Sequence, residues 1–290
     1  MAGRAISKEE VLIAALPYIT KYETKTFVVK YGGAAQADES LRETFAKDVT
    51  LLKKIGINIV IVHGGGKEIT EALAAMNIET RFVDGQRYTD ERTMEVVLMV
   101  LSGKITPEIV SRINRNGGDA VGLCGADGEL MTARRYSENG KDIGLVGEVT
   151  RVNTVFLNLL LSKGYIPVIA PTAVGTGGEF YNVNADFAAA EIAAALRAEK
   201  LVYMSDVPGV LVDDQLVSSL TESQAAEMID RGQITGGMIP KVNSAFKTIN
   251  AGVSKVHLID GRIKHSLLLE IFTDEGVGTE MLGSAPQPVN

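Results

Sequence analysis

The sequence is poor in the residues that most often build metal or redox centres. Among its 290 residues it has one cysteine, Cys124, and three histidines, His63, His257 and His265. A single thiol excludes an internal disulfide and cannot by itself make a thiolate metal site. Cys124 ends the apolar stretch DAVGLC, so we interpret it as a core residue. We expect no metal site built from protein side chains.

Long apolar runs and targeting segments are also missing. No stretch approaches the roughly 18 consecutive apolar residues that span a bilayer. The opening MAGRAISKEE has no apolar core behind its basic residue and soon turns acidic, unlike a secretory signal or a transit peptide. We therefore predict a protein of the reducing cytoplasm.

An excess of basic charge is absent, and so are several familiar motifs. The formal charge of −7 argues against nucleic acid or an anionic membrane as the main partner, because both attract basic surfaces. Neither GxxxxGK(S/T) nor GxGxxG occurs, so an ordinary phosphate loop and a dinucleotide fingerprint are not supported. HExxH and GxSxG do not occur either, which argues against a zinc hydrolase and a serine esterase.

What the chain does contain is an alternation of apolar strands and helical segments. The apolar fraction of 46% and the charged fraction of 22% are those of a globular protein. The strand runs lack period-two alternation, which suits strands covered on both faces. We predict an α/β fold, a three-layer αβα sandwich with a central, mostly parallel sheet. The predicted strands are residues 26–30, 57–62, 119–124, 165–170, 200–205 and 255–260.

Three segments carry organisational meaning. The polar residues 131–153 predict a hairpin outside the main sheet. The alanine-rich helix that ends near Ala198 is followed by a new strand, which places a domain boundary near Ala195. Residues 8–22 have helical spacing, although Pro17 should kink or split that helix. The helix could pack on its own domain or join subunits, and its pattern does not distinguish the two.

Two lysines lie where an unpaired cation is unfavourable. Lys30 follows the apolar run TFVV, so its ammonium lies at the carboxyl end of a buried strand. Lys241 follows the loop GQITGGMIP and opens a helical stretch, whose dipole should repel a cation. Both positions make sense if a strongly anionic group binds between them. A phosphoryl group in transfer is such a group, since its catalysis is mostly positioning and charge neutralisation.

Polar and glycine-rich loops supply further candidates. Gly64–Gly66 separate a strand from a helix, an arrangement that favours an anion cradle over a plain flexible turn. Arg87 could bind a carboxylate in bidentate fashion or be a solvated loop arginine. Asn184 or Asp186 could cap the alanine-rich helix. Together with Asn182 they could instead orient the two lysines and a substrate.

These motifs together resemble the amino acid kinase family over almost the whole chain. The resemblance implies transfer of a phosphoryl group from ATP to N-acetyl-L-glutamate, the second step of arginine synthesis. Members acting on aspartate, glutamate, carbamate or a nucleoside monophosphate are the nearest alternatives, and a non-catalytic arginine sensor is another. The matching motifs are KYGG (Lys30–Gly33), HGGG (His63–Gly66), GxRxT (Gly85–Thr89), NVNAD (Asn182–Asp186) and GGMIPK (Gly236–Lys241).

The resemblance also implies individual roles. Lys30 and Lys241 would stabilise the migrating phosphoryl group, and Asp186 would hold both lysines. The substrate carboxylate is already ionised at neutral pH, so no general base is needed. Magnesium would be held mainly by the nucleotide. The implied substrate-binding residues are Gly64, Gly65, Gly66, Arg87 and Asn182, and the implied nucleotide-binding residues are Gly33, Ser205, Asp206 and Lys241.

The two ends resemble the arginine-inhibited, hexameric branch of that family. The implied divisions are an oligomerisation helix (1–24), an N-acetyl-L-glutamate-binding domain (25–195) and an ATP-binding domain with an arginine site (196–290). Arginine would shift the ring of subunits, a trimer of dimers, toward a less active conformation. The candidate arginine-site residues are Glu270, Gly276, Gly278, Lys200 and Tyr18.

Overall fold

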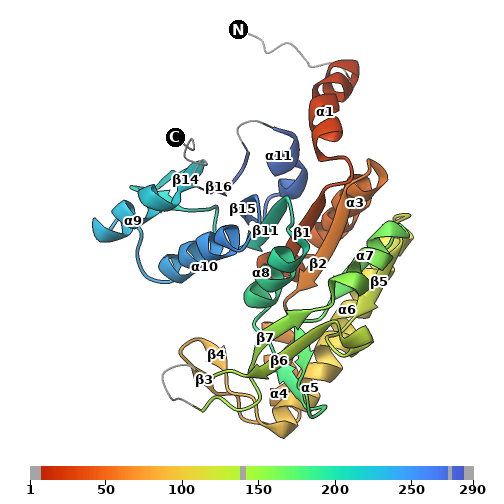
Figure 1. The fold of residues 1–290 in the computed structure, drawn as a ribbon, viewed down its shortest axis with the longest axis vertical. Helices are drawn as coiled ribbons and strands as arrows, with labels where there is room; N and C mark the ends of the chain where they lie inside the picture. Colours follow the sequence, from red (N-terminus) through yellow and green to blue (C-terminus); the bar gives the residue numbers. More distant parts are fainter. Residues whose placement is uncertain (1–7, 138–141, 274–275, 284–290) are drawn as a thin grey trace, which may run out of the picture.

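The centre of the molecule is an eight-stranded sheet, seen in a computed structural model that describes residues 8–137, 142–273 and 276–283 (Figure 1). Neighbouring strands from β5 to β15 run parallel, and β15 pairs with β16 in the antiparallel sense. The predicted mostly parallel sheet is confirmed. In spatial order the strands are β14 (Ser219–Thr221), β16 (Thr279–Leu282), β15 (Lys255–Asp260), β11 (Lys200–Ser205), β1 (Thr26–Tyr31), β2 (Asn58–His63), β8 (Ile166–Ile169) and β5 (Ala120–Leu123).

Each of the six predicted core strands is present, with ends that differ by at most one residue. Their side chains are mostly buried, because helices cover both faces of the sheet. Continuous apolar runs are therefore a reliable sign of these strands.

Two apolar clusters, one on each face of the sheet, make the sandwich three-layered. Along β1, Phe27 and Val29 enter one cluster and Val28 enters the other, as the period of a strand requires. Lys30 has the parity of Val28, so its side chain is on the face covered by α8. The first cluster includes residues of α2 (Ala34–Ala37), α3 (Glu39–Lys54), α4 (Gly66–Ala75), α5 (Glu91–Val100), α6 (Thr106–Arg115) and α11 (Ser266–Phe272). The second includes residues of α7 (Thr154–Ser162), α8 (Ala185–Leu196), α9 (Glu222–Asp230) and α10 (Met238–Asn250).

The polar segment predicted as a hairpin forms part of a separate sheet. Its strands β6 (Met131–Arg135) and β7 (Gly147–Val152) pair in the antiparallel sense, which confirms the prediction. They belong to a four-stranded sheet with β9 (Thr172–Val174) and β10 (Phe180–Asn182). Two short hairpins complete the strands, β3 (Phe82–Val83) with β4 (Gln86–Arg87) and β12 (Leu211–Val212) with β13 (Gln215–Leu216).

The amino-terminal helix α1 (Lys8–Tyr22) runs through Pro17 as one element. Of the two expected effects of Pro17, a kink or a split, the split is wrong, because the hydrogen bonds on either side of the one that proline removes can keep the helix continuous. In Figure 1 the helix projects from the body of the molecule. In the described part of the chain, neither α1 nor any other helix is both long and apolar enough to cross a membrane.

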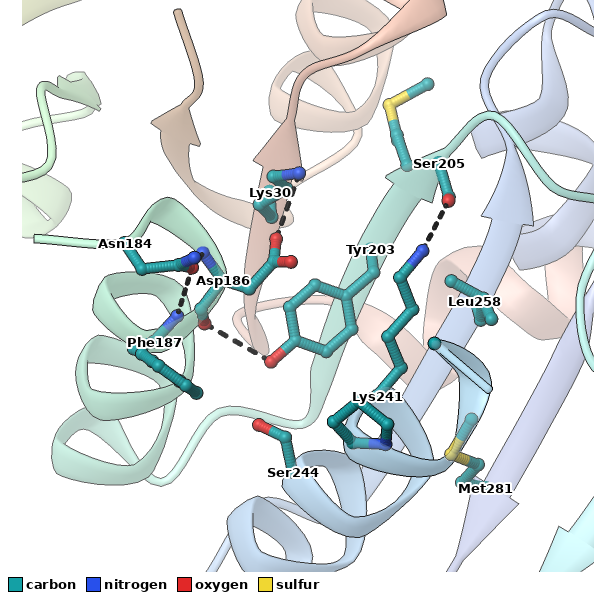
Figure 2. Close-up of a pocket in the computed structure, with 13 residues that line it drawn as sticks. Lys30, Asn184, Asp186, Phe187, Tyr203, Ser205, Lys241, Ser244, Leu258 and Met281 are labelled. Carbon is teal, nitrogen blue, oxygen red and sulfur yellow. Dashed lines mark hydrogen bonds and ion pairs between the residues drawn. The ribbon is translucent and has the colours of Figure 1, made fainter. Parts of the chain in front are cut away.

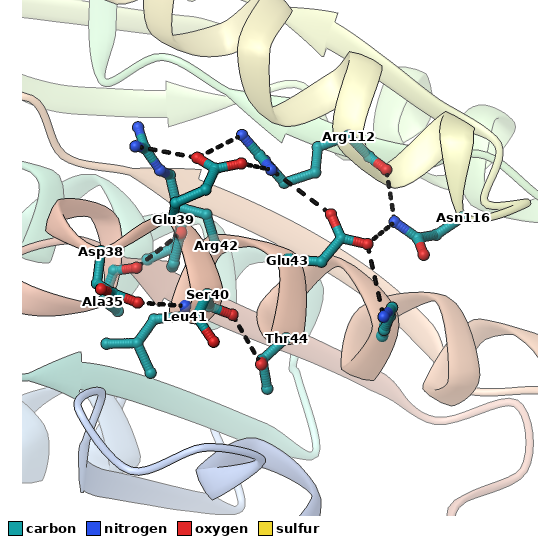
Figure 3. A network of polar contacts seen from close by, with 12 residues as sticks. Ala35, Asp38, Glu39, Ser40, Leu41, Arg42, Glu43, Thr44, Arg112 and Asn116 are labelled. Carbon is teal, nitrogen blue, oxygen red and sulfur yellow. Dashed lines mark hydrogen bonds and ion pairs between the residues drawn. The ribbon is translucent and has the colours of Figure 1, made fainter.

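Helices α3 and α6 are joined by a network of charged side chains (Figure 3). Arg112 of α6 contacts Glu39 at 2.6 Å and Glu43 at 3.5 Å, and Asn116 also donates to Glu43. These contacts fix α6 against α3.

Two short helical turns are not α-helical. The π-helical turn η1 (Leu101–Ile105) lies directly before α6, and the 3-10 turn η2 (Asp127–Glu129) follows β5.

Candidate active site

Two adjoining pockets lie where β1, β2 and β11 end, as the switch from strand to loop predicts for such sheets. The glycine-loop pocket, of about 220 Å³, is lined by Gly64–Gly66, Arg87 and Asn182 among others. The α10 pocket, of about 240 Å³, is lined by residues of β11 and α10 (Figure 2). The residues common to both linings are Lys30, Asn184 and Asp186.

Lys30 lies in this shared wall and is held by a carboxylate. Its Nζ is 2.9 Å from Oδ1 of Asp186, and the lysine side chain is 18% exposed. Gly32 leaves room for the ammonium, because a Cβ at that position would lie 3.2 Å from Lys30 Nζ. The charge that seemed unfavourable in the sequence is therefore paired, yet open to the cavity on both sides.

Lys241 is not held by Asp186, although the sequence led us to expect that Asp186 orients both lysines. It is in the first turn of α10, and its Nζ donates to Ser205 Oγ at 3.2 Å. Ser205 ends β11 and its hydroxyl in turn donates to Asp206 Oδ1 at 3.3 Å. Asp186 pairs with Lys30 instead. The two lysines thus line the same pocket from opposite sides with separate anchors (Figure 2).

The amino end of α8 forms the wall between the pockets. Asn184 is its N-cap, with Oδ1 accepting from the N–H of Asp186 at 2.8 Å and of Phe187 at 3.4 Å. The capping interpretation is therefore confirmed for Asn184, and Asp186 is in the first helical turn. The partial positive charge of a helix amino terminus adds to that of Lys30 at this point.

The glycine loop turns β2 into α4 next to the wall. Gly64 donates its N–H to Tyr31 O at 2.8 Å, so this amide is already used. Gly65 is the N-cap and Gly66 the first residue of α4, positions whose N–H groups have no acceptor within the helix. A Cβ on Gly65 would lie 2.5 Å from the side chain of Ile105 and 2.6 Å from that of Leu101. A side chain at this position would have to displace the ends of both.

Arg87 lines the same pocket. It is in β4 of a short hairpin rather than in a free loop. Its Nη2 donates to Gly66 O and to Thr70 Oγ1, both at 2.8 Å, and its Cζ is 4.9 Å from the ring centre of Phe82. Its Nη1 is buried and has no hydrogen-bond partner within the described chain. Burial lowers the pKa of this guanidinium, a cost that an anionic ligand would offset.

The remaining predicted residues divide between the pockets. Asn182 lines the glycine-loop pocket and donates from Nδ2 to Thr89 Oγ1 at 3.1 Å. Ser205 and Lys241 line the α10 pocket, whereas Gly33 and Asp206 are not among the described residues that line it. Gly33, with φ 60°, is the N-cap of α2.

Sequence reasoning missed Tyr203, which lies between the two lysine anchors in Figure 2. Its hydroxyl donates to the main-chain oxygen of Asp186 at 3.3 Å, so it joins β11 to α8. It also lines the α10 pocket with Ser244. The signal available in the sequence was a tyrosine near the end of the otherwise apolar strand KLVYMS, where a hydroxyl must find a partner.

The candidate arginine-site residues lie near one another, and none of them is among the described residues that line either pocket. Glu270 accepts the N–H groups of Val277 at 2.7 Å and Gly278 at 3.1 Å, and its other oxygen is 2.6 Å from His257 Nδ1. Lys200 lies nearby, 5.0 Å above the ring centre of Tyr22, and burial lowers its pKa to about 8. A Cβ on Gly276 would lie 2.8 Å from a Glu270 oxygen. Tyr18 packs edge-on against Phe272 of α11, with 6.2 Å between ring centres.

The donor chemistry of the α10 pocket suits phosphate oxygens. Two ammonium groups and the hydroxyls of Ser205 and Ser244 line it. Within the described residues no group of three or more His, Cys, Asp or Glu side chains is arranged to hold a metal ion. A magnesium ion that arrives on nucleotide phosphates fits these residues, because phosphate oxygens and water would be its main ligands.

Comparisons with known proteins agree with this geometry. Residues 25–260 match the amino acid kinase family. The acetylglutamate kinase of Chlorobaculum tepidum is 54% identical over 277 residues, which are 96% of this chain and 97% of that protein. The acetylglutamate kinase of Aquifex aeolicus is also 54% identical, over 95% of this chain and 98% of that protein.

Solved structures show the same architecture. An N-acetylglutamate synthase from Neisseria gonorrhoeae, complexed with coenzyme A and N-acetyl-glutamate, superposes with a TM-score of 0.86 at 26% identity. The match covers 96% of this chain and 64% of the synthase chain. A carbamate kinase from Giardia lamblia shares the fold, with a TM-score of 0.63 at 15% identity and 90% of this chain covered.

Proposed function

This chain belongs to the amino acid kinase family, and from that premise we propose that it transfers the γ-phosphoryl group of ATP to the γ-carboxylate of N-acetyl-L-glutamate. Two acetylglutamate kinases are 54% identical to this chain over nearly the full length of both proteins, which makes the chain an ATP-dependent phosphotransferase with a carboxyl acceptor. The observation that carries the proposal is the wall shared by the two pockets, where Lys30, Asn184 and Asp186 separate one cavity from the other.

The glycine-loop pocket is our proposed acid site. A dicarboxylate there would receive the unpaired Nη1 of Arg87 on one carboxylate. Its other carboxylate would then point to the shared wall, near Lys30 and the amino end of α8. An acetylated nitrogen carries no charge, so it needs no carboxylate partner beside Arg87. This is why N-acetyl-L-glutamate is favoured over free glutamate or aspartate.

The α10 pocket is our proposed nucleotide site, with its phosphates toward Lys30 and Lys241. Attack by the substrate carboxylate forms the new oxygen–phosphorus bond as the bond to the β-phosphate oxygen breaks, and ADP leaves. Lys30, oriented by Asp186, neutralises charge that spreads over the transferring group. Lys241 would exchange its Ser205 anchor for the phosphate. Magnesium bound to the nucleotide would neutralise further phosphate charge.

The proposed division of labour follows the chain. Residues 25–195 would supply the acid site, and residues 196–290 would supply most of the nucleotide site. The two linings support this division, because those residues of the α10 pocket that are not shared all follow residue 186.

Inhibition by arginine and assembly into a hexamer belong to the proposal as well. Glu270 is a buried carboxylate beside Lys200 and the loop at Gly276, and it would pair with the guanidinium of arginine. The apolar residues Ile13 and Leu16 of α1 are 70% and 55% exposed. A helix that leaves such residues uncovered on its own subunit supports a role in joining subunits.

The experiment is ADP release with ATP and magnesium in the presence of N-acetyl-L-glutamate, glutamate or aspartate, each with and without arginine. We expect turnover with the acetylated acid alone and suppression by arginine. Turnover that arginine does not suppress would support the proposed kinase activity and reject the proposed arginine site. Turnover with another acid would replace the substrate, and no turnover with any acid would leave the arginine-sensor alternative.

A further inference from the structure

Behind the glycine loop lies a fully buried imidazole that the proposed reaction does not use. His63 ends β2, is 0% exposed, and has a partner for each ring nitrogen. Its Nδ1 is 2.9 Å from Gly64 O, and its Nε2 is 2.7 Å from Thr106 Oγ1. Thr106 is itself 4% exposed and is the first residue of α6, directly after the π-turn Leu101–Ile105.

These contacts fix the tautomer of the ring. A carbonyl oxygen can only accept, so the proton must be on Nδ1 to bond Gly64 O. Burial lowers the pKa of His63 to about 4, and the neutral ring then accepts at Nε2 from the Thr106 hydroxyl. Leu101 O lies 2.9 Å from the same hydroxyl and is a second acceptor for its one proton. With the ring proton on Nδ1, the bare Nε2 at 2.7 Å can bond the hydroxyl only by accepting from it, so this tautomer requires the proton to point to the histidine.

The bond from His63 acts on one particular peptide unit. Gly64 O and the N–H of Gly65 belong to the same peptide, and it is trans, as are all those described. In a trans peptide these two groups point in opposite directions. Holding the oxygen back toward His63 therefore turns the Gly65 N–H the other way. We propose that His63, set by Thr106, is a positioning residue that aims the Gly65 amide at the acid in the glycine-loop pocket.

Glycine at position 65 makes such a hold necessary. Glycine has little intrinsic preference between peptide orientations, so a flip of the Gly64–Gly65 peptide would meet a small barrier. A flipped peptide would present a carbonyl oxygen to an anionic ligand and repel it. Leu101 and Ile105 of the π-turn occupy the space that a Cβ on residue 65 would take, and Leu101 also lines the pocket. The glycine loop and the π-turn are thus joined by the His63–Thr106 hydrogen bond and by the packing of Leu101 and Ile105 at Gly65.

The first test compares two replacements of His63, and it rests on the proposed acid substrate. His63→Asn keeps an N–H donor near Nδ1, whereas His63→Gln places its amide near Nε2. We expect His63→Gln to raise KM for N-acetyl-L-glutamate about tenfold or more, the loss of one hydrogen bond to a charged group. His63→Asn should raise it about threefold or less, and KM for ATP should stay within about twofold in both. Equal losses in both variants, or equal rises in both KM values, would overturn the positioning role.

A second pair of variants tests the hydrogen bond between Thr106 and His63. Thr106→Ser keeps the hydroxyl, and Thr106→Val keeps the shape without it. Thr106→Val should raise KM for the acid several-fold while Thr106→Ser restores it. Thr50→Val is the matched control, since Thr50 is a buried helical threonine whose hydroxyl bonds Ala46 O in α3. If Thr106→Val and Thr50→Val change KM for the acid equally, the Thr106 hydroxyl does not orient the His63 ring.

A third measurement needs no activity and no folding of a variant. Nitrogen-15 NMR of the histidine rings in the wild-type chain should show His63 with a protonated Nδ1, an unprotonated Nε2 and no titration between about pH 5 and 8. An Nε2-protonated or charged ring would overturn the proposal. The measured tautomer does not depend on the substrate. A chain that shows this tautomer but does not phosphorylate N-acetyl-L-glutamate would refute the proposed function, and the proposed orientation of the Gly64–Gly65 peptide would stand.

Discussion

Lys30 is a partly buried cation and Arg87 is a buried one, and their charges are paired to different extents. Lys30 has Asp186 at 2.9 Å, so its charge is paired before any ligand arrives. Arg87 has hydrogen bonds on Nη2 and none on the buried Nη1 within the described chain. A group that is already paired can serve a charge that develops in the transition state, whereas an unpaired donor serves ground-state binding. The two residues should therefore differ in which kinetic constant they control.

Replacing Lys30 by methionine should reduce kcat by about a hundredfold to a thousandfold, the usual loss of one preorganised charge in phosphoryl transfer. KM for N-acetyl-L-glutamate should change much less. Steady-state kinetics with Lys163→Met as a control, an exposed lysine beyond α7, would separate this from a general loss of positive charge. A kcat within about threefold of wild type would mean that Lys30 is not the catalytic cation.

Replacing Arg87 by lysine should raise KM for the acid about tenfold or more and leave kcat nearly unchanged. A lysine ammonium cannot bond Gly66 O, Thr70 and a ligand carboxylate in the fork geometry of a guanidinium. Arg81→Lys is the matched control, because Arg81 is an exposed arginine near Arg87 that stacks on Tyr88. Equal KM values for the two variants would remove Arg87 from the acid site.

At the scale of helices and strands, Asp48 of α3 and His265 join the two halves of the molecule. Asp48 Oδ1 is 2.6 Å from His265 Nδ1, in the turn that precedes α11. Burial raises the pKa of Asp48 to about 6, although the bond to His265 opposes the rise. The folded chain therefore keeps this proton to a higher pH than the unfolded chain does. Folding stability contributed by Asp48 should fall as pH rises from about 4 to 6.

The variant Asp48→Asn lacks this titration, so its stability relative to wild type should improve with pH. We expect the difference in free energy of unfolding to move by about 2 kcal/mol in favour of the variant between pH 4.5 and 7. Urea unfolding at both pH values measures it, with the exposed Asp230→Asn as control. A difference that stays constant with pH would show that Asp48 is ionised throughout.

The elements were largely predictable from the sequence, and their contacts were not. Apolar runs identified the core strands, and glycines identified the loop before α4. Pro17 does not split α1, since a single missing N–H does not end a helix that is otherwise hydrogen-bonded. Lys241 could be placed near a helix start, but its bond to Ser205 depends on how α10 packs beside β11. The hydrogen bond from His63 to Thr106 joins residues 43 positions apart in sequence, so no local pattern could reveal it.

At the scale of the whole molecule, α1 should connect subunits and transmit the effect of arginine. Removal of residues 1–24 should lower the mass measured by light scattering and weaken arginine inhibition about tenfold or more, a coupling of ordinary size. Catalysis without arginine should persist, since no residue of α1 is among the described residues that line the two pockets. A control that replaces the exposed Ile13 and Leu16 by serine should lower the mass without deleting chain. Unchanged inhibition in the truncated enzyme would disprove this role.

The wall shared by the two pockets has a consequence for inhibitor design. Since Lys30, Asn184 and Asp186 line both cavities, the proposed acid and nucleotide sites adjoin at these three side chains. A single molecule that joins an acylated glutamate to adenosine through a phosphate chain could therefore occupy both cavities at once. Its second half would bind at the high effective concentration set by the short link. Its acyl half would distinguish this enzyme from relatives with a similar nucleotide pocket.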